Sequence, residues 1–123
     1  MPSYFLNDDV FYCDISDNIA TIMDPSTGIS WETNRFSAIL LENLLNRVPT
    51  GNITAALKAL PNVPADIVSR FDRFTALLVH KKILKESDPL EAACIINAAI
   101  AAQEGFNPEL YEINDSGRFL LDI

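Results

Sequence analysis

The stretch Ile29-Ser-Trp-Glu-Thr-Asn-Arg-Phe-Ser-Ala-Ile-Leu-Leu-Glu-Asn-Leu-Leu45 contains the change of pattern that decides the fold. Its first five residues alternate between the two faces of an extended chain, as in a half-buried strand. After Asn34, apolar residues return every three or four positions, at Phe36, Leu40 and Leu44, which is the period of an amphipathic helix. The sequence therefore predicts a strand that passes directly into a helix at Asn34.

The residues before this stretch predict two further strands. Residues 10–15 and 19–23 are rich in β-branched, aromatic and other apolar side chains, and each is followed by a turn. Residues 16–18 (Ser-Asp-Asn) favour a turn because Asp and Asn tolerate the left-handed backbone conformation, and Pro25 and Gly28 mark the second turn. Strands joined by such short turns form a meander, so we expect a three-stranded antiparallel sheet.

The residues after this stretch predict three helices and an extension. Helical spacing continues to about Val48, returns over residues 53–60 and runs again over residues 65–85, with proline at each break. A fourth helix is expected over residues 88–103, followed by a tail of turns and short apolar segments. Three strands followed by three helices is a winged-helix-like order, so the predicted fold class is α+β with an extra C-terminal helix and tail.

The predicted third helix has two notable faces. One face is a continuous apolar stripe that we expect to lie in the core; its residues are Ile67, Phe71, Phe74 and Leu78. The other face has two leucines between basic side chains; its residues are Arg70, Arg73, Leu77, Lys81 and Leu84. This second face is either a solvated helix surface or a cationic surface that meets an acidic partner or an acidic part of the same chain.

The charge of the chain is distributed in blocks. The 123 residues carry a formal net charge of −8, which argues against a general nucleic-acid or anionic-membrane binder. Residues 1–34 contain six acidic and no basic residues, residues 35–85 contain eight basic and three acidic residues, and residues 86–123 contain eight acidic and one basic residue. The sequence therefore predicts a basic helical block between two acidic segments.

The inventory for catalysis is small. His80 is the single histidine, and Cys13 and Cys94 lie far apart without metal-ligand spacing. Residues 24–28 form a hairpin turn without the Gly-Lys-Ser/Thr of a phosphate loop. The N-terminal residues lack the pattern of a signal peptide. We therefore expect a cytoplasmic, non-enzymatic domain with no catalytic residues, no metal and no cofactor.

Residues 29–45 resemble the signature of the PqqD family. Trp31 takes the place of the family's aromatic residue, Asn34 closes the third strand as the family's Asn does, and Ser37 is the small residue before an Ile/Leu-rich helix. Thr33 departs from the signature, because a large aliphatic residue is usual there, and this weakens the inward anchor of the strand. The resemblance implies a recognition domain over residues 1–86 and a C-terminal helix and acidic tail over residues 87–123.

The resemblance also implies a function. PqqD-like modules are peptide chaperones that bind a precursor or leader peptide and present it to a modifying enzyme, a radical S-adenosylmethionine enzyme or another maturation enzyme. The peptide adds as a strand to the edge of the third strand and packs on the third helix, a mode known as β-augmentation. Carried over by position, the implied peptide-binding residues are Ser30, Trp31, Glu32, Thr33, Arg70, Arg73, Leu77, Lys81 and Leu84.

Three questions stay open at this point. A winged-helix DNA-binding regulator is an alternative, although the acidic segments would repel phosphates and our expectation is no nucleic-acid and no membrane partner. A structural subunit that forms a homodimer through its apolar helix faces is another. The tail is also expected to compete in cis, with residues 111–113 or 119–121 lying on the same strand edge or on the basic helix.

Overall fold

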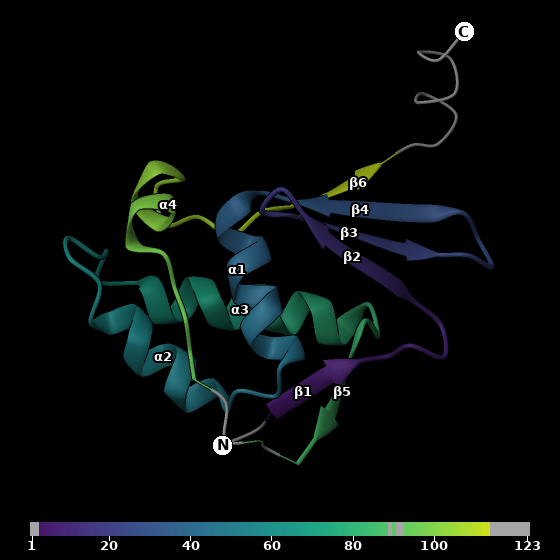
Figure 1. Ribbon diagram of the computed structural model, residues 1–123, viewed down its shortest axis with the longest axis horizontal. Helices are drawn as coiled ribbons and strands as arrows, with labels where there is room; N and C mark the ends of the chain where they lie inside the picture. The colour runs from purple at the N-terminus through teal and green to yellow at the C-terminus, as the bar shows by residue number, and fades with distance from the viewer. Residues whose placement is uncertain (1–2, 89, 91–92, 114–123) are drawn as a thin grey trace, which may run out of the picture.

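The computed structural model describes residues 3–88, 90 and 93–113, which fold as α+β with antiparallel sheets (Figure 1). The elements in chain order are β1 (Ser3–Leu6), β2 (Tyr12–Ser16), β3 (Ile19–Asp24), β4 (Ile29–Thr33), α1 (Arg35–Leu45), α2 (Thr50–Lys58), α3 (Ile67–His80), β5 (Leu84–Ser87), α4 (Ala98–Gln103) and β6 (Leu110–Ile113).

The predicted meander is present as β2, β3 and β4. Asp17 and Asn18 both have positive φ in the first turn, and Gly28 has φ 75° at the end of the second, as the composition of these turns predicts. The prediction of a three-stranded sheet is wrong in number, because β6 pairs with β4 and the strand order is β2-β3-β4-β6. β6 has only four residues, which is too short for the alternation of a strand to be recognised in the sequence.

The third helix ends earlier than predicted. Periodicity extended it over residues 65–85, whereas α3 ends at His80. Lys82 adopts φ 62°, and the amide of Ile83 donates to the carbonyl of Leu78 at 3.0 Å, which is the closing bond of a Schellman motif. Glycine usually occupies this left-handed position, so a lysine there hid the end of the helix from the sequence pattern.

The chain after α3 forms a strand that pairs with an unpredicted strand at the start of the chain. β5 is antiparallel to β1 in a separate two-stranded sheet at the lower end of Figure 1. The adjoining Asn7 fixes this arrangement, since its amide side chain donates to the carbonyl of Lys82 at 2.9 Å and its backbone N–H donates to the carbonyl of Ile83 at 2.8 Å. The end of α3 is therefore held by the N-terminal residues.

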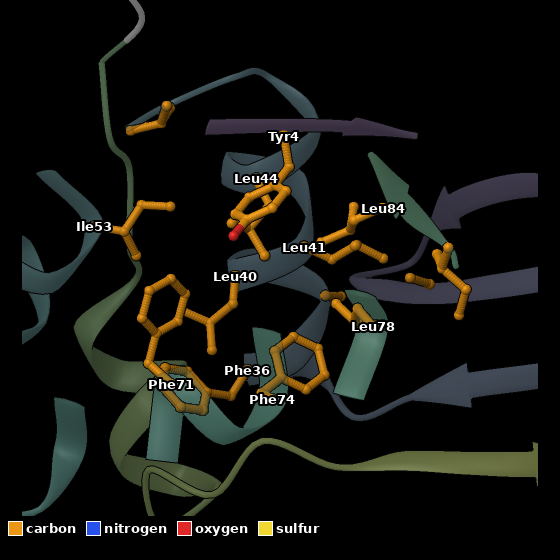
Figure 2. Packing of buried hydrophobic residues seen from close by; sticks show 14 of the residues in the cluster. Tyr4, Phe36, Leu40, Leu41, Leu44, Ile53, Phe71, Phe74, Leu78 and Leu84 are labelled. Atoms are coloured by element: carbon orange, nitrogen blue, oxygen red, sulfur yellow. The ribbon is translucent and has the colours of Figure 1, made fainter. Parts of the chain in front are cut away.

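The core lies between α1, α3 and the inner face of the larger sheet. The four residues predicted as the α3 stripe are all buried, as are most apolar residues of α1. Figure 2 shows these side chains gathered with Tyr4 from β1, Ile53 from α2 and Leu84 from β5. No helix in the described part of the chain is long and apolar enough to cross a membrane.

The predicted fourth helix is wrong over much of its length. We expect a helix over 88–103, but among the residues of this range that the structure describes, only Ala98–Gln103 is helical and residues 93–97 are irregular. The side chain of Asn43 explains part of this, because it donates to the carbonyl of Ile95 at 2.8 Å and accepts from the amide of Ile95 at 3.0 Å. These bonds satisfy the backbone of Ile95 without a helix.

Thr33 is the buried end of β4, and its replacement by valine is expected to destabilise the fold. Its Oγ1 accepts a hydrogen bond from the amide of Ala20 at 3.0 Å, so a polar contact anchors this end of the strand. Thr33→Val leaves that buried amide without a partner and should lower the free energy of unfolding by about 1–3 kcal/mol in urea denaturation. The control is Thr27→Val in the exposed turn, where water can replace the hydroxyl and the loss should stay below about 0.5 kcal/mol. Equal losses would contradict this role.

Candidate functional site

The predicted binding edge on β4 is paired with another part of the same chain. Each of the four predicted strand residues lies directly opposite a residue of β6; the pairs are Ser30 with Ile113, Trp31 with Glu112, Glu32 with Tyr111 and Thr33 with Leu110. The segment at 111–113 therefore lies on this edge, as one of the expectations for the tail had it. The other candidate, residues 119–121, lies outside the described residues.

The junction between β4 and α1 holds the segment that leads into β6. Asn34 is the N-cap of α1, and its side chain both accepts from the amide of Ser37 at 3.0 Å and donates to the carbonyl of Asn107 at 2.8 Å. The hydroxyl of Ser37 accepts from the amide of Glu109 at 2.6 Å. The sequence indicated Asn34 as a boundary and Ser37 as a small residue, but it gave no sign that both bind residues more than 70 positions away.

The side chain of Arg70 is engaged in contacts within the chain and is not free at the surface. Its guanidinium donates to the carbonyl of Gly105 at 3.1 Å and to the side chain of Asn107 at 2.8 Å, and it forms an ion pair with Asp66 at 2.9 Å. Phe106 lies between these contacts, buried edge-to-face against Phe36. Arg70 therefore anchors the approach to β6 on α3.

A groove of about 460 Å³ lies between α3 and the segment that enters β6. Arg73, Phe74 and Leu77 line it from α3, and Leu110 lines it from β6. Leu77 is 39% exposed, and the side chain of Arg73 contacts only the carbonyl of Ser69 in its own helix, at 3.3 Å, among the hydrogen bonds of the described residues. The groove thus offers an apolar surface beside a cation that is available to a ligand.

Lys81 completes the basic side of the site. Its Nζ lies 5.3 Å from the centre of the Trp31 ring, a cation–π contact. Trp31 is only 9% exposed and is packed on its inner side by Phe11, at 5.9 Å between ring centres. Trp31 is therefore a rigid platform that links β4 to the end of α3, and it is not a free side chain.

Leu84 does not belong to the site. The prediction placed it on the third helix, one turn beyond Lys81, but it lies in β5 opposite Leu6 and is 4% exposed. The reason is the helix end at His80, which turns the following residues towards β1. The structure thus brings Trp31 and Thr33 to the same side of β4 as Arg70, Arg73, Leu77 and Lys81. Ser30 and Glu32 alternate with them and lie on the other face of the strand, and Leu84 is excluded.

The candidate nucleophiles and ligands are dispersed. Burial, followed by the charge of Asp14, raises the pKa of Cys13 to about 11, and burial also raises the pKa of Cys94. His80 is exposed at the end of α3. Among the residues that the structure describes, no three His, Cys, Asp or Glu side chains are grouped so that they could hold a metal ion.

Comparison with known proteins adds no assignment. No protein-family model, no curated protein and no solved structure matches this chain. The interpretation of the site therefore depends on its geometry and on the chemistry of the residues named above.

Arg70 and Arg73 are expected to respond differently to the loss of their charge. Arg70→Met removes the hydrogen bonds to residues 105–107 and should lower the free energy of unfolding by about 1.5–3 kcal/mol, because charged groups donate them. Arg73→Met, one helical turn away and exposed, should change it by less than about 0.5 kcal/mol. Urea denaturation of the two variants checks this, and a similar loss for both would mean that Arg73 is also structural.

Cys13 is expected to react slowly with alkylating reagents. Because the thiolate is the reactive form, a pKa of about 11 should make alkylation by iodoacetamide at pH 8 about 100-fold slower in the folded chain than in the unfolded chain. Mass spectrometry of a Cys94→Ser variant, in buffer and in urea, isolates this rate. The alkylation rate of the folded chain should keep rising with pH to about pH 11. A plateau of this rate near pH 9 would contradict a raised pKa of Cys13.

Proposed function

We propose that the chain is a non-catalytic peptide-binding module of the PqqD-like kind, which binds a precursor or leader peptide and presents it to a modifying enzyme. One observation carries the proposal. An extended segment, β6, pairs antiparallel with the β4 edge beside α3, so this edge is able to hold a strand in the position where the peptide is expected (Figure 1). The order β2-β3-β4-α1-α2-α3 supports a winged-helix-like core, with the other elements as additions.

The chemistry of the site favours an extended peptide with acidic and apolar side chains. Strand addition supplies backbone hydrogen bonds without regard to sequence, and the neighbouring side chains then supply selectivity. Leu77 and Phe74 offer an apolar wall, while Arg73 and Lys81 offer positive charge on either side of it. A carboxylate and an aliphatic side chain on the same face of the peptide would therefore meet complementary partners.

The remaining parts of the proposal come from the resemblance. The receiving enzyme would be a radical S-adenosylmethionine enzyme or another maturation enzyme, and the encounter would take place in the cytoplasm. The DNA-binding alternative is less favoured, because Arg70 of α3 is engaged within the chain and because Glu109 and Glu112 lie on the segment beside α3. Carboxylates at that position would repel phosphates.

The test is selection of binders from a random peptide library on the full chain, followed by charge reversal. Selected peptides should carry acidic and apolar residues, and the double variant Arg73→Glu, Lys81→Glu should weaken their binding about tenfold or more, because two favourable charge contacts become repulsive. The matched control is Lys58→Glu on the exposed end of α2, which should leave the affinity unchanged. Fluorescence anisotropy measures both.

Two outcomes would contradict the proposal. Selected peptides that bind the double variant as tightly as the unmodified chain do not use the α3 groove. Duplex DNA that binds with a steep loss of affinity as salt increases, while no peptide is selected, would favour the DNA-binding alternative, since strand addition depends on salt only modestly.

A further inference from the structure

The two faces of β6 have different surroundings. Side chains of neighbouring strand residues alternate, and directly opposite residues of antiparallel strands share a face. Leu110 and Glu112 therefore share the inner face with Thr33 and Trp31. Leu110 also lines the groove, so an aliphatic side chain of β6 already faces the apolar part of α3 across it.

Glu112 lies on the same edge as the cation of Lys81. It is opposite Trp31, and the same aromatic ring carries the ammonium group of Lys81 at 5.3 Å. Among the described residues Lys81 forms no ion pair within 4 Å, and Glu112 is exposed. A carboxylate at this register position is thus attracted by a cation that no ion pair neutralises, and β6 supplies one.

β6 and the segment before it are held in different ways. Residues 105–109 are fixed by the side chains of Arg70, Asn34 and Ser37 and by the buried Phe106. Among the described strands, β6 lies at the edge of its sheet with β4 as its one neighbour, and Tyr111 and Glu112 are exposed. Local opening of β6 can therefore occur while the anchored segment stays in place.

We infer that β6 is an internal copy of the ligand. The inference depends on the proposed function and names the ligand's class: an extended acidic peptide that places an aliphatic side chain opposite Thr33 and a carboxylate opposite Trp31. This peptide binds by replacing β6 on β4. The chain's own strand competes at an effective concentration in the millimolar range. An added peptide can bind only while β6 is unpaired, so its apparent affinity falls in proportion to the fraction of molecules in which the edge is open.

The alternation of hydrogen bonds in the ladder provides a matched pair of variants. The amide of Asn34 donates to the carbonyl of Glu109, which makes these two residues a hydrogen-bonding pair. By alternation, the N–H of Tyr111 faces β4 and that of Glu112 faces away from it. Tyr111→Pro should therefore release β6. Glu112→Pro should keep the backbone pairing of β6, since proline is compatible with the solvent side of an edge strand, and should lose only the attraction of the carboxylate to Lys81, about two- to fivefold.

Trp31 reports directly on this edge. It is the single tryptophan of the chain, so excitation at about 295 nm follows it alone, and its emission should shift to longer wavelength when β6 leaves. The probe is a capped synthetic peptide with the sequence of residues 107–113. It should restore the emission of Tyr111→Pro and bind this variant at least about tenfold more tightly than the unmodified chain, whereas Glu112→Pro should gain only about two- to fivefold. A probe with Gln in place of Glu112 should bind about two- to fivefold more weakly.

Each contrary result has a separate meaning. A probe that fails to bind Tyr111→Pro, or that binds both proline variants and the unmodified chain alike, overturns the inference but leaves the library selection as it stands. Peptides from the library that bind while β6 remains paired also overturn it and keep the proposed function. Conversely, failure of the library to yield any peptide binder removes the proposed function, and binding of the probe then shows only that β6 can return to its own edge.

A variant at the end of β6 keeps the experiment decisive if Tyr111→Pro does not fold. If Tyr111→Pro shows the emission of the unfolded chain, Ile113→Pro replaces it, because Ile113 occupies the next hydrogen-bonding position, opposite Ser30, and releases only the end of β6. The same gain in probe affinity, about tenfold or less, is expected. An unchanged affinity in a folded Ile113→Pro chain would overturn the inference.

Discussion

The first turn of α1 constrains the path of the chain from Glu104 to β6. A helix leaves its first amide groups without partners, and these must be satisfied from outside the helix. The side chain of Asn34 accepts from the amide of Ser37, and the carboxylate of Glu104 accepts from the amides of Arg35 and Phe36 at 2.6 and 3.2 Å. Because Glu104 ends α4, this anion at the start of α1 also fixes where the chain emerges from α4. The approach to β6 follows directly from that contact.

The edge of β4 and the groove on α3 are consequences of the same placement. An exposed sheet edge presents unpaired backbone groups and tends to acquire a strand, and here the nearest extended segment is the chain's own. The basic side chains of α3 divide into two roles as a result. Arg70 holds the approach to β6 in place, whereas Arg73 and Lys81 remain at the surface of the site. One helix therefore carries a basic side chain that is engaged within the chain and two that stay at the surface of the site.

Local signals located many of the elements of residues 1–86. The turn residues Asp17 and Asn18, the boundary at Asn34 and the buried stripe of α3 all lie where neighbouring residues alone indicate them. The end of α3 was missed because Lys82 occupies a left-handed position where glycine is usual. Leu84 was consequently assigned to the site although it is buried in β5. Helical spacing alone does not show that a residue one turn further along, such as Leu84, already lies beyond the end of the helix.

The sequence by itself therefore determined the local elements: the meander, the strand-to-helix transition and the amphipathic faces, since each depends on interactions within a few residues. The tertiary structure was needed to pair β1 with β5, and to place residues 110–113 on the β4 edge where the sequence had left two tail segments and two surfaces open. It also decided that Asn34 and Ser37 bind Asn107 and Glu109. The physical reason is that a strand pairs through its backbone, which carries no side-chain code, so the choice of partner depends on where distant parts of the core bring the chain together.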